Sequence, residues 1–242
     1  MHKIELDHVT KRYKGGVLAL NDISLQISEG MTTGLVGPNG AGKTTMVNIL
    51  AGLIKVTKGS VSVCGFNPQK REKEMKMQIS AVFEDPIFFE NLYVQEHLEL
   101  INVLYEMESK QAVVDIMKKW DVEKYRKKRL STLSKGNRKR VVIATAFMRE
   151  FSVSILDEPF KELDIYGRQL LEEEINTYKK QGKTMLITSH EMGQLERCCD
   201  EIALIKDGKL LDKKSLSEIK SEIKSGHYKD FEEFIYKSFK RE

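Results

Sequence analysis

The first part of the chain alternates between hydrophobic and polar residues with a period of two. The alternation is clearest at residues 4–7 and 23–27, and a pair of glycines at residues 15 and 16 lies between these segments. A period of two is typical of strands that bury one face, and paired glycines suit a hairpin turn. Two valines between flanking glycines indicate another short strand at residues 61–63. The pattern therefore predicts an antiparallel β subdomain at the front of the chain.

Later segments contain short hydrophobic runs instead of alternation. Such runs are typical of parallel strands that are covered by helices on both faces. We therefore expect a mostly parallel sheet built from residues 31–36, 79–83, 153–156, 184–188 and 202–205.

Hydrophobic residues follow helical spacing between and after these runs. The positions i, i+3, i+4 and i+7 are apolar at residues 113–120, and a similar spacing recurs at residues 141–148. Leu98, Ile101 and Leu104 indicate one more helix. We therefore predict an α/β fold with a mostly parallel sheet, the N-terminal antiparallel subdomain and an inserted α-helical subdomain at about residues 86–136.

The composition is that of an ordinary globular protein. The 242 residues are 40% hydrophobic and 31% charged, which excludes a disordered, collagen-like or disulfide-stapled chain. The longest apolar stretch, residues 141–148, is far shorter than the roughly 18 residues of a membrane-spanning helix. We see no secretory leader after Met1, and a net charge of +4 is weak evidence for a polyanionic partner.

A glycine-rich segment between a predicted strand and a predicted helix matches the pattern G-x-x-x-x-G-K-[ST]. Glycines let the backbone curl so that N–H groups point at phosphate oxygens, and the following helix adds the positive end of its dipole. The lysine supplies a charge for the β- and γ-phosphates, and the next hydroxyl can bind Mg²⁺. The sequence therefore predicts a P-loop for a nucleoside triphosphate at Gly37, Pro38, Asn39, Gly40, Ala41, Gly42, Lys43, Thr44 and Thr45.

Two further segments place polar residues at the carboxyl ends of core strands, where ligands bind in α/β sheets. Asp157 and Glu158 follow one hydrophobic run directly. We expect Asp157 to hold Mg²⁺ and Glu158 to polarise the attacking water. His190 ends the next strand in the same manner and is a further catalytic candidate, although a lone histidine is more often structural.

Together with Leu-Ser-Lys-Gly-Asn at residues 133–137, these motifs resemble the ATPase subunit of ATP-binding cassette (ABC) transporters. This segment precedes a predicted helix and looks like the signature sequence of that family. The resemblance runs from Tyr13 to about Leu211, so we expect an ABC ATPase domain at residues 1–212 and a C-terminal helical extension at residues 213–242. It implies the P-loop NTPase fold, and ATP and Mg²⁺ as cofactors.

The resemblance also implies roles for single residues. Tyr13 would stack on adenine, with a purely structural strand tyrosine as an equal alternative. Lys43 and His190 would contact the γ-phosphate, and Glu158 would act as the general base. Thr44, Asp157 and Glu84 would bind Mg²⁺.

The resemblance implies that three residues take part in the contact between two copies of such a subunit. Ser134 and Gly136 would reach ATP that is held by a second copy, because a hydroxyl and an unobstructed N–H lie at a helix N-terminus. Asp164 falls in the dimer-contact loop of the family. ATP would then hold two subunits together, in a homodimer or a heterodimer, and hydrolysis would release them.

Five residues depart from the family pattern. Glu84 replaces the usual glutamine and adds negative charge beside the triphosphate, so we expect weaker ATP affinity, slower turnover or greater dependence on Mg²⁺. Lys135 and Asn137 replace a glycine and a glutamine in the signature. Lys161 and Glu162 replace small residues in the dimer-contact loop.

The resemblance further implies a membrane-embedded permease as the partner, with this subunit cytoplasmic and peripheral on the inner face of the membrane. The run of segments is similar to the drug, bacteriocin and peptide exporter branch, which implies a drug, peptide or lipid-like cargo. The alternative is a soluble ABC ATPase that acts in repair, translation or cofactor assembly. Two cassettes or long coiled coils are typical of such proteins and neither is visible here.

Two segments leave their roles open. Residues 86–93 carry aromatic side chains, and the resemblance implies that this region lines a groove for a short helix of the membrane subunit; we expect most of these rings to pack inside the helical insert instead. Eight of the fifteen residues at 126–140 are basic. Attraction to the partner's triphosphate and contact with anionic lipid headgroups are alternatives for this stretch, and a solvated helix face is the default interpretation. Tyr125 is the lone aromatic residue there, so we expect no nucleic-acid partner.

Overall fold

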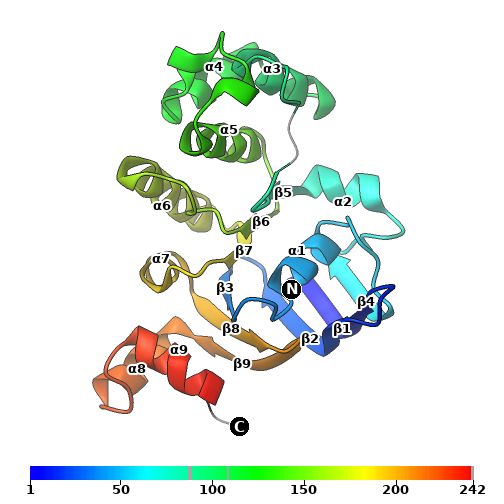
Figure 1. Ribbon diagram of the computed structural model, residues 1–242, viewed down its shortest axis with the longest axis vertical. Coiled ribbons are helices and arrows are strands. Elements are labelled where there is room, and N and C mark those ends of the chain that lie inside the picture. The colour runs from blue at the N-terminus through cyan, green and yellow to red at the C-terminus, as the bar shows by residue number, and fades with distance from the viewer. Residues whose placement is uncertain (87–88, 108, 241–242) are drawn as a thin grey trace.

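The computed structural model describes residues 1–86, 89–107 and 109–240. Its centre is a sheet of six strands in the order β5-β6-β7-β3-β8-β9 (Figure 1). The first five strands pair in parallel, and β9 pairs antiparallel with β8. The strands are β3 (Thr32–Val36), β5 (Ile79–Val82), β6 (Val153–Asp157), β7 (Thr184–Thr188), β8 (Glu201–Lys206) and β9 (Lys209–Ser215).

A second, antiparallel sheet is formed by the front of the chain. Its order is β2-β1-β4, with β1 (His2–Arg12), β2 (Leu18–Ser28) and β4 (Lys58–Val63). In the hairpin of β1 and β2, Leu6 lies opposite Leu25, and both side chains are buried. The predicted α/β class with its front antiparallel subdomain is therefore confirmed.

The central sheet separates two hydrophobic cores. Leu35 and Ile155 belong to the core under the antiparallel sheet, whereas the residues that follow them, Val36 and Leu156, belong to the core on the opposite face. Successive strand side chains point to opposite faces, so an uninterrupted hydrophobic run fills both cores. This explains why the strands of the central sheet contain uninterrupted hydrophobic runs, whereas hydrophobic and polar residues alternate in β1 and β2.

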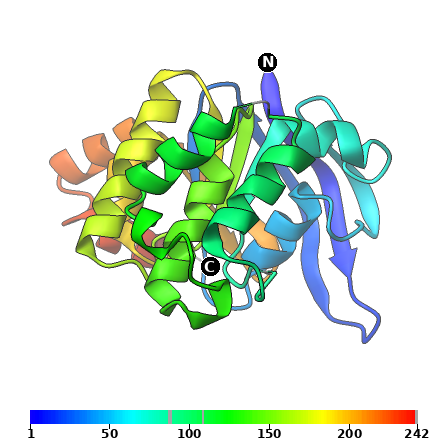
Figure 2. The ribbon, with the colours of Figure 1, turned by 90° about the horizontal axis from the view of Figure 1, so that it is seen from above.

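Helices cover both faces of the central sheet. α1 (Lys43–Leu50) and α2 (Glu72–Gln78) contribute to the core on the side of the antiparallel sheet. α6 (Ile165–Lys180) and α7 (Met192–Cys198) contribute to the other. Figure 2 shows the antiparallel strands at one side of the molecule and the C-terminal helices at the opposite side.

The inserted helical subdomain packs above the end of the sheet that β5 and β6 form (Figure 1). Trp120, just after α4, is buried in its core, as the helical spacing requires. Leu104 is exposed, so the apolar stripe of the first helix ends before its last turn. The subdomain contains α3 (Val94–Leu104), α4 (Lys110–Lys119), 3₁₀ turns at Glu123–Tyr125 and Leu130–Thr132, and α5 (Lys135–Phe147).

Two expectations for this region are wrong in part. Phe89 is 58% exposed and Tyr93 39% exposed, so these aromatic rings do not pack inside the insert; Ile87 and Phe88 lie outside the described residues. The basic stretch is also no uniform solvated helix face. Lys139 and Arg140 are buried on α5, because carboxylates and carbonyl groups of neighbouring segments receive their charged ends.

The C-terminal segment packs on the body of the protein. β9 spans residues on both sides of position 213, where we expected the extension to begin. The helices α8 (Leu216–Lys224) and α9 (Phe231–Lys240) add Ile219 and Phe234 to the same core as α6 and α7. Among the described residues, no helix is both long and apolar enough to cross a membrane.

An aromatic cluster joins the helical subdomain to the central layer, and we predict that it carries much of the stability of this junction. Phe147 of α5 packs on Phe151 and on Tyr178 of α6, whose hydroxyl donates to the Phe147 carbonyl. Phe147→Ala should lower the free energy of unfolding by about 3–5 kcal/mol, because it leaves a large cavity. Chemical denaturation measures this loss. Tyr236→Ala, which truncates an exposed ring, should change stability by less than about 0.5 kcal/mol; equal losses would contradict the prediction.

Candidate nucleotide-binding and hydrolysis site

The predicted phosphate loop connects β3 to α1 and lies tightly against neighbouring backbone. A Cβ atom at Gly37 would lie 2.2 Å from the carbonyl oxygen of Ile205. Gly42, the residue before α1, has φ +107°, and a Cβ there would lie 2.6 Å from the carbonyl oxygen of Ala19. Larger residues at either position would push the loop away from the sheet. The glycines therefore fix the loop in place as well as letting it curl.

The start of α1 offers positive charge to this loop. No side chain caps the helix, so its N-terminal dipole is directed at the cavity in front of it. Lys43 is buried, and its Nζ donates to the carbonyl oxygens of Gly37 at 2.7 Å and Pro38 at 3.1 Å. Burial lowers the pKa of Lys43, and nearby carboxylates oppose the shift. An anion in the loop would give this cation a stronger partner than two carbonyl groups.

Asp157 and Thr188 end two neighbouring strands and lie opposite each other in the β6–β7 pairing. The Thr188 hydroxyl donates to Asp157 Oδ1 at 2.5 Å. Asp157 Oδ2 is buried without a hydrogen-bond partner within the part of the chain that the structure describes. Burial raises the pKa of Asp157, because desolvation penalises the charged form more than Thr188 stabilises it. An orphaned carboxylate oxygen in this place suits a cation or its bound water.

Glu158 has a left-handed backbone, with φ +45°, that a bulky residue adopts only under constraint. Its N–H donates to Thr188, to the hydroxyl at 3.0 Å and the carbonyl at 3.2 Å. Its Oε1 lies 3.4 Å from His190 Nε2, and its Oε2 accepts from the His190 N–H at 3.4 Å. Burial raises the pKa of Glu158. A carboxylate of raised pKa beside an imidazole suits general-base chemistry.

Glu84 lies just after β5 and brings a third carboxylate to the same place. Its Oε1 lies 2.5 Å from the Nζ of Lys161, which comes from the segment between β6 and α6. Thr44, Glu84 and Asp157 line one continuous cavity. Acidic and hydroxyl oxygens therefore meet directly beside the phosphate loop.

The cavity has a volume of about 230 Å³ and contains most of the predicted site. Val17, just before β2, and Leu18 and Ala19, its first residues, also line the cavity. They were not predicted, since no sequence pattern marks an apolar wall. Thr188 was not assigned a role either, although its position at a strand end was visible. The predicted residues that line the cavity are Asn39, Gly40, Ala41, Gly42, Lys43, Thr44, Thr45, Glu84, Asp157, Glu158 and His190.

Tyr13 lies at the edge of this region. Its hydroxyl is 3.2 Å from the Thr45 hydroxyl, its ring is 40% exposed, and Lys11 Nζ lies 5.0 Å from the ring centroid. The ring lies next to the first turn of α1 and is partly open to solvent, and its stacking on adenine stays a prediction.

The predicted dimer residues lie outside the cavity of their own chain. Ser134 caps α5, with its hydroxyl accepting from the Asn137 N–H at 3.4 Å. A Cβ at Gly136 would lie 2.9 Å from the Glu162 carbonyl, so the signature packs against the segment before α6. Asp164 caps α6 and accepts two hydrogen bonds from Arg140, a pairing that sequence reasoning did not identify.

The C-terminal helix also approaches the phosphate loop. A second cavity of about 260 Å³ lies between Phe239 of α9 and the loop residues Gly37 and Pro38. His190 borders both cavities. α9 and the phosphate loop therefore face each other across this second cavity.

The residues present fit a nucleoside triphosphate with Mg²⁺. Across residues 1–86, 89–107 and 109–240, no group of three His, Cys, Asp or Glu side chains is arranged to hold a metal ion alone. Magnesium does not need such a group, since it binds through one or two protein oxygens together with phosphates and water. With a nucleotide bound, the orphaned Asp157 oxygen and the hydroxyl of Thr44 would provide these protein oxygens.

Curated relatives of this chain are ATP-binding proteins of transporters. The uncharacterized ABC transporter ATP-binding protein YcbN of Bacillus subtilis is 33% identical over 220 residues, 90% of this chain and 71% of the relative. The Nod factor export ATP-binding protein I of Burkholderia orbicola is 32% identical over 209 residues, 85% of this chain and 68% of the relative.

Solved structures agree with the fold. The ATP-binding subunit of an ABC transporter superposes with a TM-score of 0.84 at 26% identity, covering 91% of this chain and 92% of the other. A dimeric post-hydrolysis state of the ATP-binding cassette MJ0796, bound to ADP and Pi, superposes with a TM-score of 0.81 at 25% identity, covering 88% and 98%.

The sequence profile of the family described as ABC transporter matches residues 20–161, which is more than half of the chain. The protein therefore belongs to the ABC transporter family, as one of its ATP-binding subunits with ATPase activity.

Proposed function

We propose that this subunit binds ATP with Mg²⁺ in the cavity at the phosphate loop, closes as a dimer around the nucleotide and powers a separate membrane permease. The observation that carries the proposal is the meeting of Lys43, Thr44, Asp157, Glu158 and His190 at one cavity, although they come from three separate parts of the chain. The hydrolysis step follows from the chemistry of these groups.

Each residue has a distinct task in this proposal. Lys43 exchanges its two carbonyl acceptors for the β- and γ-phosphates, which are stronger partners for a cation of lowered pKa. Thr44, Asp157 and Glu84 hold Mg²⁺, directly or through water, and the ion neutralises phosphate charge when bound. Glu158 accepts a proton from the attacking water, and His190 orients its carboxylate and reaches the γ-phosphate.

The site is completed by a second subunit. Ser134, Gly136 and Asp164 lie outside the cavity of their own chain, and a helix N-terminus is a ready anion site. In the proposed dimer, these residues reach the nucleotide that the other subunit holds. The dimeric state of the cassette MJ0796 with ADP and Pi supports this arrangement.

The permease would dock on the groove beside the insert. A cavity of about 570 Å³ extends from Leu53 to α3 and includes Phe83, Phe89, Ile101 and Tyr105. An apolar groove of this size suits a short helix of a membrane subunit, which would hold this protein at the inner face of the membrane. The relative named for Nod factor export supports export as the direction of transport, and a drug, peptide or lipid-like cargo rests on the resemblance to the exporter branch.

Glu158→Gln tests the hydrolytic role. Removal of the general base should lower the rate of phosphate release by about 10²- to 10⁴-fold, while ATP still binds because the phosphate loop is intact. ATP that is not hydrolysed should then hold two copies together, so light scattering with MgATP should report a dimer.

The control for this variant is Glu150→Gln, which removes the same charge from an exposed residue that pairs with Lys183. It should keep the wild-type rate and remain monomeric after hydrolysis. A Glu158→Gln protein that hydrolyses ATP normally, or stays monomeric with MgATP, would contradict the proposal.

Asp157→Asn should stabilise the nucleotide-free protein while it weakens Mg²⁺-dependent ATP binding. The wild-type carboxylate is buried with one oxygen unpartnered, and an amide removes this charge while keeping an acceptor for Thr188. We expect Tm to rise by about 2–4 °C at pH 7, which corresponds to about 1 kcal/mol.

The gain from Asp157→Asn should depend on pH in a defined direction. Because the folded-state pKa of Asp157 is raised, its ionisation destabilises the folded protein above that pKa. As pH falls through the folded-state pKa and below the unfolded value of about 4, both states are protonated and the penalty is lost. Thermal unfolding at several pH values checks this; a gain that grows on acidification would refute it.

A further inference from the structure

The nucleotide cavity contains one carboxylate more than the resemblance to the family leads us to expect. Glu84 stands where a glutamine is usual, beside Asp157 and Glu158 on the wall of the same cavity. A triphosphate is itself strongly anionic, and like charges repel more strongly where protein lowers the effective dielectric. Glu84 therefore needs a compensating cation if the cavity is to bind ATP well.

Lys161 is placed to be that cation. Its Nζ lies 2.5 Å from Glu84 Oε1, across a sequence separation of 77 residues. The backbone N–H of Lys161 donates to the carbonyl oxygen of Glu158 at 3.3 Å. The backbone of Lys161 is thus bound to that of Glu158, the proposed general base, while its side chain binds the carboxylate of Glu84.

A second lysine fixes the backbone next to Glu84. Lys139, on α5 of the helical subdomain, is 4% exposed, and its Nζ donates to the carbonyl oxygen of Phe83 at 3.5 Å. Phe83 directly precedes Glu84 in the chain. The Glu84 segment is therefore held from two sides, by α5 at its backbone and by the segment before α6 at its carboxylate.

We propose that Lys161 is a positioning residue and counter-ion for Glu84, which holds this carboxylate and offsets its charge so that an acidic residue is tolerated beside the triphosphate. The inference rests on the proposed function, in which ATP and Mg²⁺ occupy this cavity. The Glu84–Lys161 pair then has no net charge, like a glutamine beside a neutral residue, and an oxygen of Glu84 stays available on the Mg²⁺ side.

The proposal predicts which form of the nucleotide, metal-free ATP or MgATP, binds more weakly when Lys161 is replaced. Uncompensated Glu84 repels ATP without metal more than MgATP, because Mg²⁺ neutralises part of the phosphate charge. Lys161→Met should weaken the binding of metal-free ATP by about three- to tenfold and the binding of MgATP by less. The loss should shrink as ionic strength rises, since the pair is partly exposed to solvent.

A double-mutant cycle separates this effect from a structural one. Equilibrium binding of ATP, in EDTA and with Mg²⁺, is measured for the wild type, Lys161→Met, Glu84→Gln and the double variant. In the Glu84→Gln background there is no charge to offset, so Lys161→Met should change ATP affinity by less than about twofold. Lys161→Arg, which keeps the cation, should retain the affinity of the wild type.

Lys76→Met is the matched control. Lys76 also forms a 2.5 Å ion pair, with Glu72, and is similarly exposed, but it lies on α2 and does not line the nucleotide cavity. It should leave ATP binding unchanged. Thermal unfolding of every variant confirms that each is folded under the binding conditions.

Three outcomes decide the matter. Equal losses from Lys161→Met with and without Glu84 would overturn the counter-ion role, and so would an equal loss from Lys76→Met. A preserved affinity in Lys161→Met at low ionic strength would overturn it as well. A wild-type protein that binds no ATP would instead refute the proposed function itself, so the two failures are distinguishable.

Discussion

The hydrogen bond from Thr188 to Asp157 is the interaction on which the site depends. It joins the carboxyl ends of β6 and β7, and the same hydroxyl accepts from the N–H of Glu158. The backbone ladder sets the distance between the strands, and this one threonine contacts both acidic residues, at the carboxylate of Asp157 and at the backbone of Glu158. β7 lies between β6 and β3 in the sheet, and the phosphate loop follows β3. The register of these three strands therefore fixes the loop relative to the carboxylates.

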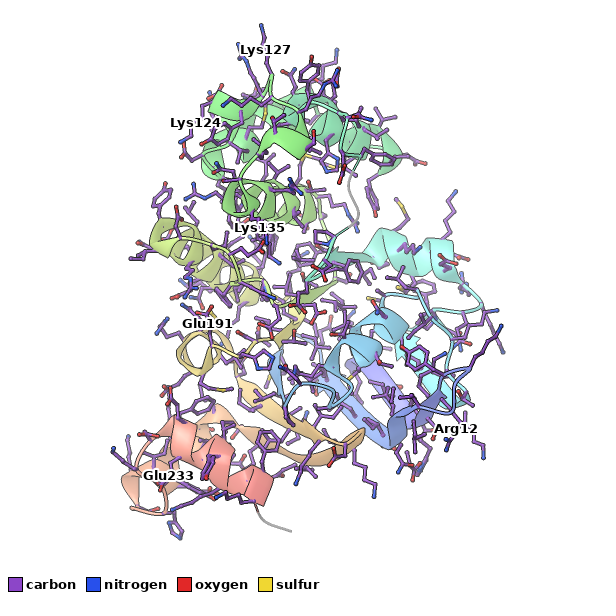
Figure 3. The ribbon with its side chains drawn as sticks, in the orientation of Figure 1. Arg12, Lys124, Lys127, Lys135, Glu191 and Glu233 are labelled. Atoms are coloured by element: carbon purple, nitrogen blue, oxygen red, sulfur yellow. The ribbon has the colours of Figure 1, made fainter. Side chains whose placement is uncertain are left out.

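The same arrangement explains how distant segments reach one point. Helices cover both faces of the central sheet, so its carboxyl edge is the part of the core left open to ligands. The helical subdomain reaches this edge through Lys139, whereas the Phe147 cluster ties it to the opposite edge, near the amino ends of β6 and β7. Figure 3 labels Lys135, a residue of the signature at the start of α5, and its Nζ lies 3.8 Å from Glu162 Oε1 in the segment before α6. The insert therefore contacts both the Glu84 segment and the segment before α6.

Sequence patterns identified what is local. The phosphate loop, the strand-end Asp157 and Glu158, and the alternating front strands each have their signal within ten or so neighbouring residues. The ion pair of Glu84 with Lys161 was out of reach, because it joins segments that the fold alone brings together. Burial of Lys139 was missed for the same reason: a basic run looks solvated until its partners are known. The exposure of Phe89 was missed because hydrophobicity favours a core without showing where the core ends.

The left-handed backbone at Glu158 has an evolutionary consequence. Glycine or asparagine adopts this conformation with less strain, and Glu162 a few residues later has positive φ as well. Selection for thermal stability alone would favour glycine or asparagine at these two positions. At Glu158 the strained backbone coincides with a carboxylate that lines the nucleotide cavity, so a change to glycine that relieved the strain would also remove the proposed general base.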